Sequence, residues 1–301
     1  MNDAKKITAE LRGHWFGHYG LAFCPAHDNA NTPALSLKNA EDGTLLTYCH
    51  AGCTFQHVRD ALMQRGLLPL RVGAPQKLCA PSYKTGPTLA QIAVAARKAK
   101  RATTLWRAAT PMDSSLTMRY LSERAISCPT PPTLRSLGDC RHPSGKHIPT
   151  MIARVDGATT FAVHRTFLAD DGSAKTRLHP AKAMLGSCKG GAVHLSSINI
   201  HTLGGPLVVT EGIENGLSLL SGLLDTPATV WAALSTSGIT SLTLPRLPGH
   251  LIIAADCDTA GQQAARKLSI RADRLGWRIS YLTPPPGQDW NDVLVQKREQ
   301  K

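Results

Sequence analysis

Short apolar runs that end in acidic residues mark the C-terminal third of the chain. The run 207–210 ends at Glu211, and the run 251–255 ends at Asp256 and Asp258. Each run has the length of a buried strand and precedes a segment with a helix-like composition. Because the carboxyl ends of parallel strands meet at one edge of a sheet, we expect these acidic side chains to lie together there.

Further strands and helices complete this pattern. Strands are predicted over 228–234 and 277–282, and helices over 213–220 and 259–275, the second of which ends at Gly276. Strand and helix alternate, which is typical of a parallel sheet with helical crossovers. The sequence therefore predicts an α/β fold with a small Rossmann-like parallel sheet.

The first part of the chain has a different pattern. Strands are predicted over 32–37 and 45–49, joined by a turn at 41–43, and a helix over 55–66 ends at Gly66. A stretch rich in proline and glycine follows and predicts a linker. After it come two predicted helices, 88–109 and 114–125, and a β-hairpin over 147–168. The chain, α+β overall, is therefore expected to comprise a zinc-ribbon-like module at 1–68, a linker at 69–87, a basic α+β subdomain at 88–203 and an α/β domain at 204–301.

Positive charge is concentrated in the middle of the chain. The formal net charge is +13. Residues 71–200 hold 19 Lys and Arg against 6 Asp and Glu, whereas the residues before and after them are balanced. A basic stretch beside an acidic site predicts a polyanionic ligand. This ligand would bind to the basic stretch and react at the acidic site. The alternative is a solvated basic surface that only aids solubility.

Nothing in the sequence predicts contact with a membrane. Residues 1–20 are polar and mixed, without the apolar core of an export signal. No run of 18 apolar residues occurs. We therefore expect a cytoplasmic protein.

The acidic strand ends predict a divalent metal. Glu211, Asp256 and Asp258 would raise one another's pKa if they lay close together without a counter-charge. Carboxylate oxygens are hard ligands that suit Mg²⁺ or Mn²⁺.

Three of the eight cysteines gather with a histidine in the first 68 residues. Cys24 and His27 form one pair, and Cys49 and Cys53 form another at the end of the neighbouring predicted strand. Two such pairs can close a tetrahedron around Zn²⁺, and four protein ligands indicate a structural site. His50 is an alternative to Cys49, since His50-x2-Cys53 is the commoner spacing, but Cys49 ends the strand and is preferred. Buried cysteines without a metal are the other interpretation.

The same region resembles a known family. The motifs are Cys24-Pro25-Ala26-His27, then Thr32-Pro33-Ala34-Leu35-Ser36, then Tyr48-Cys49 and Cys53. They resemble the zinc-binding domain of bacterial-type (DnaG-like) DNA primases. Three residues separate the last two cysteines where the commoner pattern has two, a form that is similar to plasmid- and phage-type primases.

The acidic strand ends carry a second resemblance. Glu211-Gly212 and Asp256-Cys257-Asp258 resemble the Toprim domain, which is shared by bacterial-type primases, topoisomerases and some nucleases. The resemblance implies that Glu211, Asp256 and Asp258 hold catalytic metal. Asp289 and Asp292 are candidates for outer-sphere support, and Glu214 is left outside the metal shell.

The middle of the chain resembles the basic subdomain of the same primases. A hairpin precedes a loop that bears Lys175 and Arg177, and Lys182 follows. Carried over to this sequence, Arg165, Lys175 and Arg177 are candidates for binding template phosphate or a nucleoside triphosphate, because guanidinium and ammonium groups match phosphate oxygens.

Together the resemblances imply a DNA primase of a plasmid, phage or other mobile element. It would make short RNA primers on single-stranded DNA from nucleoside triphosphates. No Gly-x4-Gly-Lys-[Ser/Thr] motif occurs, so a separate replicative helicase is the expected partner. The alternatives are a Toprim nuclease, a topoisomerase and a non-catalytic zinc and Toprim recombination mediator. A topoisomerase needs a nucleophilic tyrosine in a separate domain, and Tyr281 lies in a predicted strand. A mediator of that kind typically has cysteine-only zinc ligands and a helix-hairpin-helix, neither of which is seen.

Overall fold

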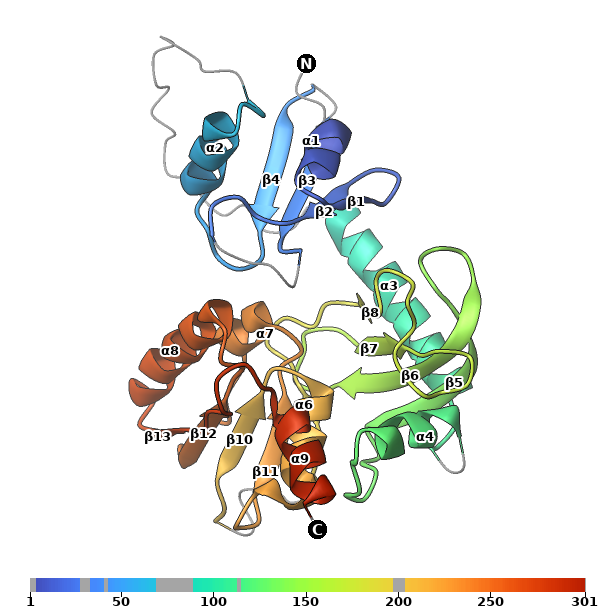
Figure 1. Ribbon diagram of the computed structural model, residues 1–301, viewed down its shortest axis with the longest axis vertical. Coiled ribbons are helices and arrows are strands. Elements are labelled where there is room, and N and C mark those ends of the chain that lie inside the picture. The colour runs from blue at the N-terminus through green and yellow to red at the C-terminus, as the bar shows by residue number, and fades with distance from the viewer. Residues whose placement is uncertain are drawn as a thin grey trace. The chain divides into compact units, whose positions relative to one another are not determined.

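The computed structural model describes residues 4–27, 33–40, 43–68, 89–112, 115–196 and 204–300. The chain divides into two compact units, 1–85 and 86–301 (Figure 1). The linker predicted over 69–87 lies outside the described residues. Among the helices that are described, none is long and apolar enough to cross a membrane.

The first unit contains a four-stranded antiparallel sheet and two helices. Side chains of β3 alternate, so that Leu35 and Leu37 are fully buried against Ile7 and Leu62, which lie on the two helices. The predicted hairpin and the helix after it are present, but the first helix and two short strands had no clear sequence pattern. In chain order the elements are α1 (Ala4–Glu10), β1 (His14–Trp15), β2 (Gly20–Ala22), β3 (Leu35–Asn39), β4 (Leu45–Cys49) and α2 (Phe55–Gln64), and the strand order is β1-β2-β3-β4.

The second unit begins with two helices and a four-stranded antiparallel sheet of order β5-β6-β7-β8. The predicted hairpin appears as β6 and β7. The strand β5 was not expected from the sequence, because its polar residues interrupt the alternation and its register shifts between Leu137 and Cys140. These elements are α3 (Leu89–Ala108), α4 (Leu116–Glu123), β5 (Leu134–Arg141), β6 (His147–Val155), β7 (Ala162–Phe167) and β8 (Lys182–Leu185).

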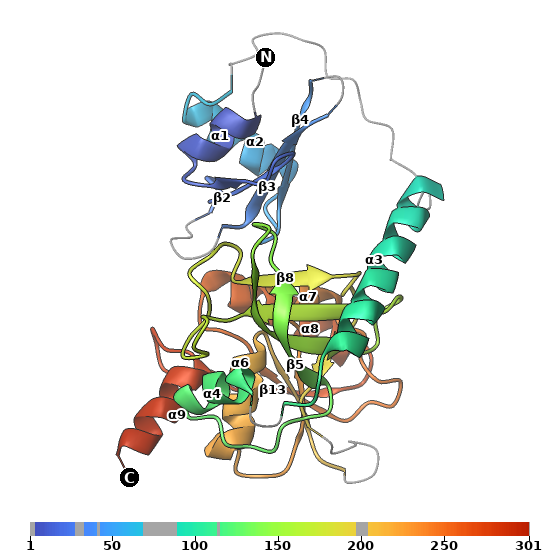
Figure 2. The ribbon, with the colours of Figure 1, turned by 90° about the vertical axis from the view of Figure 1, so that its right-hand side faces the viewer.

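The two faces of this sheet pack against different parts of the unit. On one face, Ile152, Val163 and Phe167 pack against Trp106 of α3, which lies alongside the strands in Figure 2. On the other face, Met151 and its neighbours pack with α4 and with the sheet that follows. The antiparallel sheet is therefore covered on both sides.

A five-stranded sheet of order β13-β12-β10-β11-β9 completes the second unit. The central pairs are parallel, as predicted, and the mixed α/β class is confirmed. The edge strand β9 is antiparallel to β11, a pairing that two residues are too short to reveal in sequence. The elements are β9 (Val193–His194), β10 (Leu207–Thr210), α6 (Ile213–Ser218), a π-helical turn η1 (Leu219–Leu223), β11 (Thr229–Ala232), α7 (Thr236–Ser241), β12 (His250–Ala254), α8 (Thr259–Asp273), β13 (Arg278–Tyr281) and α9 (Trp290–Glu299).

Helices cover both faces of this sheet (Figure 1). Val208 points to the face covered by α6 and α9, where Leu217 and Leu294 are buried. Val209, the next residue, points to the face covered by α7 and α8, where Leu268 is buried. Because both faces of the sheet are covered, β10 is buried at every position.

One hydrophobic cluster spans both sheets of the second unit. It contains Tyr120 and Met151 from the antiparallel part together with Val208 and Leu217 from the parallel part. The two parts share a core, which fixes the basic segment against the acidic strand ends.

We expect Leu217→Ala to lower the free energy of unfolding of the second unit by about 2–5 kcal/mol, because it leaves a cavity in this shared core. Urea unfolding followed by circular dichroism measures the change. Leu247→Ala is the matched control, since Leu247 is exposed and should change stability by less than about 0.5 kcal/mol. Equal effects of the two substitutions would contradict the assignment of the core.

Candidate active site and metal centre

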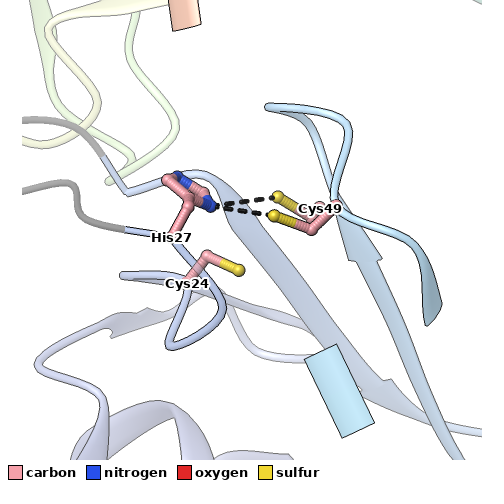
Figure 3. Close-up of side chains that lie close together, drawn as sticks. Cys24, His27 and Cys49 are labelled. Atoms are coloured by element: carbon pink, nitrogen blue, oxygen red, sulfur yellow. Dashed lines mark hydrogen bonds between the residues drawn. The ribbon is translucent and has the colours of Figure 1, made fainter. Parts of the chain in front are cut away.

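The cysteine and histidine side chains of the first unit converge at the ends of two strands. Cys24 and His27 lie in the loop after β2, and Cys49 ends β4. The ligand atoms of these three residues and Cys53 all lie within 4.8 Å of one another. Figure 3 shows the ring of His27 facing the sulfur atoms, with His27 Nδ1 at 3.1 Å from Cys53 Sγ and 3.8 Å from Cys49 Sγ.

These distances fit a tetrahedral zinc site. Ligands about 2.3 Å from a central ion are about 3.8 Å apart. Hydrogen bonding between the two thiols raises the pKa of Cys24 and lowers that of Cys49 to about 5. The soft sulfur donors of these residues favour Zn²⁺ over a hard cation. Both Cys24 and Cys49 are buried, as a closed structural site requires.

His50 has a different environment. Its Nε2 lies 2.7 Å from Ser36 Oγ, and its ring packs edge-on against Tyr48 with centroids 4.9 Å apart. The residue is not part of the converging group. The geometry thus favours Cys49 over His50 as the fourth ligand.

The acidic residues lie at the carboxyl edge of the parallel sheet, where the sequence predicted them. Glu211 follows β10, and Asp256 and Asp258 follow β12, which pairs directly with β10 so that Thr210 lies beside Ala254. The pKa of Glu211 is raised to about 7, mainly because the side chain is buried and further because the carboxylates of Asp256 and Asp258 lie near it. The carboxylates therefore act on one another through space.

Asp256 lies between an amide and further acids. Its Oδ1 accepts a 2.8 Å hydrogen bond from Asn215 Nδ2 on α6. Burial raises the pKa of Asp256, and Asp289 and Asp258 raise it further. A cation bound here would relieve this repulsion, and oxygen donors suit Mg²⁺ or Mn²⁺. Within the described ranges, however, only the cysteine and histidine group closes to a tight ligand shell, and the three carboxylates do not.

Asp258 also begins a helix. Its Oδ1 accepts a 2.6 Å hydrogen bond from the backbone N–H of Gly261 and caps α8. A Cβ atom on Gly261 would lie 2.5 Å from the carbonyl oxygen of Asp256, so only glycine fits. The Asp-x-Asp-x-x-Gly spacing is thus a requirement of the turn that presents both aspartates.

Asp289 and Asp292 have structural roles at the start of α9. Asp289 accepts hydrogen bonds from the backbone of Asn291 and Asp292, and Asp292 accepts one from Asp289 in return. This is a capping box. Asp289 also raises the pKa of Asp256, so the charge of Asp289 contributes to the acidic group.

Glu214 is buried, and its carboxylate is bound by cationic side chains. Its Oε1 lies 3.1 Å from Lys175 Nζ and accepts a 2.8 Å hydrogen bond from Tyr120, while its Oε2 lies 3.1 Å from Lys182 Nζ. Lys182 also lowers the pKa values of Glu211 and Asp256. The sequence pattern assigns no role to Lys182, Asn215 or Tyr120. The one signal in the sequence is that Asn215 lies four residues after Glu211, within the predicted helix.

The other predicted phosphate-binding residues lie apart from this cluster. Arg165 is on the α3 face of β7, between Val163 and Phe167, with its guanidinium 5.2 Å from the Phe167 ring centroid. Lys182 is on the opposite face, since Arg165 pairs with Ala183 in the register of β7 and β8. Arg177 is exposed. Of the three candidates, only Lys175 contacts Glu214, which lies in the first turn of the helix after Glu211.

The Glu214 ion pairs give stability a pH dependence. Burial alone would raise the pKa of Glu214, but Lys182 and Lys175 prevail and hold it well below its usual value of 4.5. Stability from this carboxylate is therefore present above about pH 4.5 and is lost as pH falls further. Between pH 5 and pH 3, we expect the free energy of unfolding to fall less in Glu214→Gln than in the wild type. The wild type should lose about 1.4 kcal/mol for each unit by which the pKa of Glu214 differs between the folded and unfolded states. Urea titrations at several pH values measure this, and parallel pH profiles would contradict it.

Two family models match parts of the second unit. Residues 206–299 match the family model described as a Toprim domain, and residues 96–195 match one described as a domain of unknown function (DUF7146). No curated protein is similar to the sequence at a significant level.

Several solved primase structures are similar to the chain at low identity. A primase from Aquifex aeolicus with its zinc-binding and RNA polymerase domains is 13% identical to this chain, with a TM-score of 0.41. The alignment covers 100% of this chain and 81% of the Aquifex aeolicus chain. A primase domain from Pseudomonas aeruginosa is 19% identical, with a TM-score of 0.33, over 55% of this chain and 52% of its own. The primase fragment of the bacteriophage T7 primase-helicase is 17% identical, with a TM-score of 0.31, over 50% of this chain and 63% of its own.

The family match covers both acidic strand ends, Glu211 and the pair Asp256 and Asp258, and the parallel sheet that holds them. The C-terminal part of this chain, residues 206–299, is therefore similar to the Toprim domain family.

Proposed function

We propose that the protein is a DNA primase that makes short RNA primers on single-stranded DNA. The observation that carries the proposal is the acidic edge of the Toprim sheet, where Glu211, Asp256 and Asp258 lie beside Lys182 of the basic segment. Carboxylates that hold metal, next to ammonium groups that attract phosphate, suit nucleotidyl transfer from a nucleoside triphosphate.

Each group of residues has a part in this reaction. A divalent ion such as Mg²⁺ or Mn²⁺, when bound, would activate the attacking hydroxyl and neutralise the leaving pyrophosphate. Glu211, Asp256 and Asp258 would hold it, and Asn215 would keep the Asp256 carboxylate oriented through its 2.8 Å hydrogen bond. Lys175 and Lys182 would attract the triphosphate, and the exposed Arg177 the template backbone.

The metal group in the first unit supports a primase over other Toprim chemistry. Cys24, His27, Cys49 and Cys53 would hold a structural Zn²⁺, and the sheet around them would bind the template. A Toprim nuclease would use the same carboxylates with water as nucleophile and has no need of such a module.

The basic segment would hold the nucleic acid. Five cationic side chains are exposed along α3: Arg97, Lys98, Lys100, Arg101 and Arg107. Exposed cations on one helix attract a phosphate backbone in a salt-dependent way. The motifs of the chain resemble those of plasmid- and phage-borne primases, so we place its function in the replication of such an element, with a separate helicase to open the duplex.

The test is incorporation of labelled ribonucleotides on single-stranded circular DNA with Mg²⁺. We expect short, alkali-sensitive oligomers that depend on the template and disappear with chelator. Degradation of the template without oligomers would favour a nuclease. Binding of the template with neither oligomers nor degradation would favour a non-catalytic mediator. Either of these two results would overturn the proposal.

A further inference from the structure

One buried carboxylate joins the domain of unknown function to the Toprim domain. Tyr120 from α4, Lys175 from the loop after β7 and Lys182 from β8 all lie within residues 96–195. Their three polar groups meet on Glu214, which lies on α6 within residues 206–299. The three side chains that bind this carboxylate therefore all come from the preceding domain.

The position of Glu214 relates these contacts to the acidic edge. Glu211 lies two residues before the start of α6, Glu214 lies in the first turn of this helix, and the next residue, Asn215, donates to Asp256. The same turn thus holds the lysines through one side chain and an active-site aspartate through the next. The charge of Lys182 reaches both Glu211 and Asp256, whose pKa values it lowers.

The charges of the cluster leave it attractive to an anion. Two ammonium groups share one carboxylate, so the trio carries a net charge of +1 when all three are ionised. Without the carboxylate, the two ammonium groups would repel each other and turn toward solvent. Both lysines keep solvent contact, with side chains 28% and 38% exposed, so a ligand can reach them while Glu214, at 6%, stays covered.

We propose that Glu214 is a positioning residue that holds Lys175 and Lys182 beside the Toprim carboxylates, where they meet the phosphates of the incoming nucleotide. The nature of the ligand rests on the proposed function, whereas the positioning of the lysines does not. The inference gives residues 96–195 a role: they supply the cationic half of a site whose acidic half is the Toprim edge.

Lysine acylation with N-acetoxysuccinimide, read by mass spectrometry, tests the positioning without any assay of activity. We expect Lys175 and Lys182 to react several times faster in Glu214→Gln than in the wild type, because neither ammonium group is then paired. Glu123→Gln is the matched control, since it removes the same charge from an exposed pair with Arg119 on α4 and should leave both rates unchanged. Unchanged rates in folded Glu214→Gln would overturn the proposal.

A second pair of variants keeps the test usable if Glu214→Gln does not fold. The double variant that combines Lys175→Met and Glu214→Gln has the same net charge as the wild type, because it removes one positive and one negative charge. Compared with Lys175→Met alone, it should show faster acylation of Lys182 and affinity for GTP with Mg²⁺ weakened about tenfold, or roughly 1.4 kcal/mol. Equal acylation rates and equal affinities in these two variants would overturn the proposal.

The two proposals fail in different ways. If the wild type makes no primers but Glu214→Gln exposes Lys182 to acylation, the positioning stands and the primase function fails. If primers form and the acylation of Lys182 does not change, the primase function stands and the positioning is wrong.

Discussion

Cys49→Ser is expected to release the metal of the first unit and to unfold residues 4–68. Cys49 lies at the centre of the ligand group, with its sulfur 3.8 Å from His27 Nδ1, and it is buried at the end of β4. Serine is a poor ligand for Zn²⁺. Structural zinc contributes about 10–16 kcal/mol to the folding of small zinc modules, more than a module of this size gains from its core.

Two measurements check this result. Elemental analysis should find about one zinc per chain in the wild type and none in Cys49→Ser, and limited proteolysis should cleave the first unit of the variant rapidly. The second unit should resist proteolysis, because it has its own core.

His50→Ala is the matched variant for the alternative ligand. His50 bonds to Ser36 and packs on Tyr48, so its replacement should leave the zinc content at one per chain. Loss of zinc from His50→Ala together with its retention in Cys49→Ser would reverse the assignment of the fourth ligand.

The convergence of the cysteine and histidine group and the placement of the acidic residues at strand ends were predictable, because both depend on local spacing. Cys49 ends a strand, and Asp256 and Asp258 end another, so a strand pattern and a short motif suffice to place them. The sequence leaves Glu214 outside the predicted metal shell, and in the structure its carboxylate pairs with two lysines.

The lysine cluster could not be predicted in the same way. Lys182 meets Glu214 only because β8 pairs with β7 and the whole sheet packs on α6, contacts that join residues 32 positions apart. Arg165 shows the converse. The sequence places it near Lys175, but the alternation of side chains along β7 turns it to the α3 face. Which face of a strand meets which domain depends on packing, and a single sequence does not specify this.

Asp256→Asn is expected to lower primer synthesis by about a hundredfold or more, or roughly 2.7 kcal/mol of transition-state stabilisation. Asparagine keeps the shape of the side chain and its hydrogen bond with Asn215 but supplies no charge to a metal ion. The rate of ribonucleotide incorporation under saturating Mg²⁺ measures the effect. Asp225→Asn is the matched control, since Asp225 is exposed and lies outside the acidic group, so its rate should equal that of the wild type.

The same substitution should leave the fold intact or stabilise it. The pKa of Asp256 is raised by burial and by Asp289 and Asp258, which means that its charged form is disfavoured in the folded protein without a metal. Removal of the charge relieves this repulsion. The melting temperature of Asp256→Asn in chelator should therefore equal or exceed that of the wild type. Added Mg²⁺ should raise the melting temperature of the variant less than that of the wild type. A variant that is as active as the wild type, or one that is inactive because it unfolds, would contradict a metal-binding role for this aspartate.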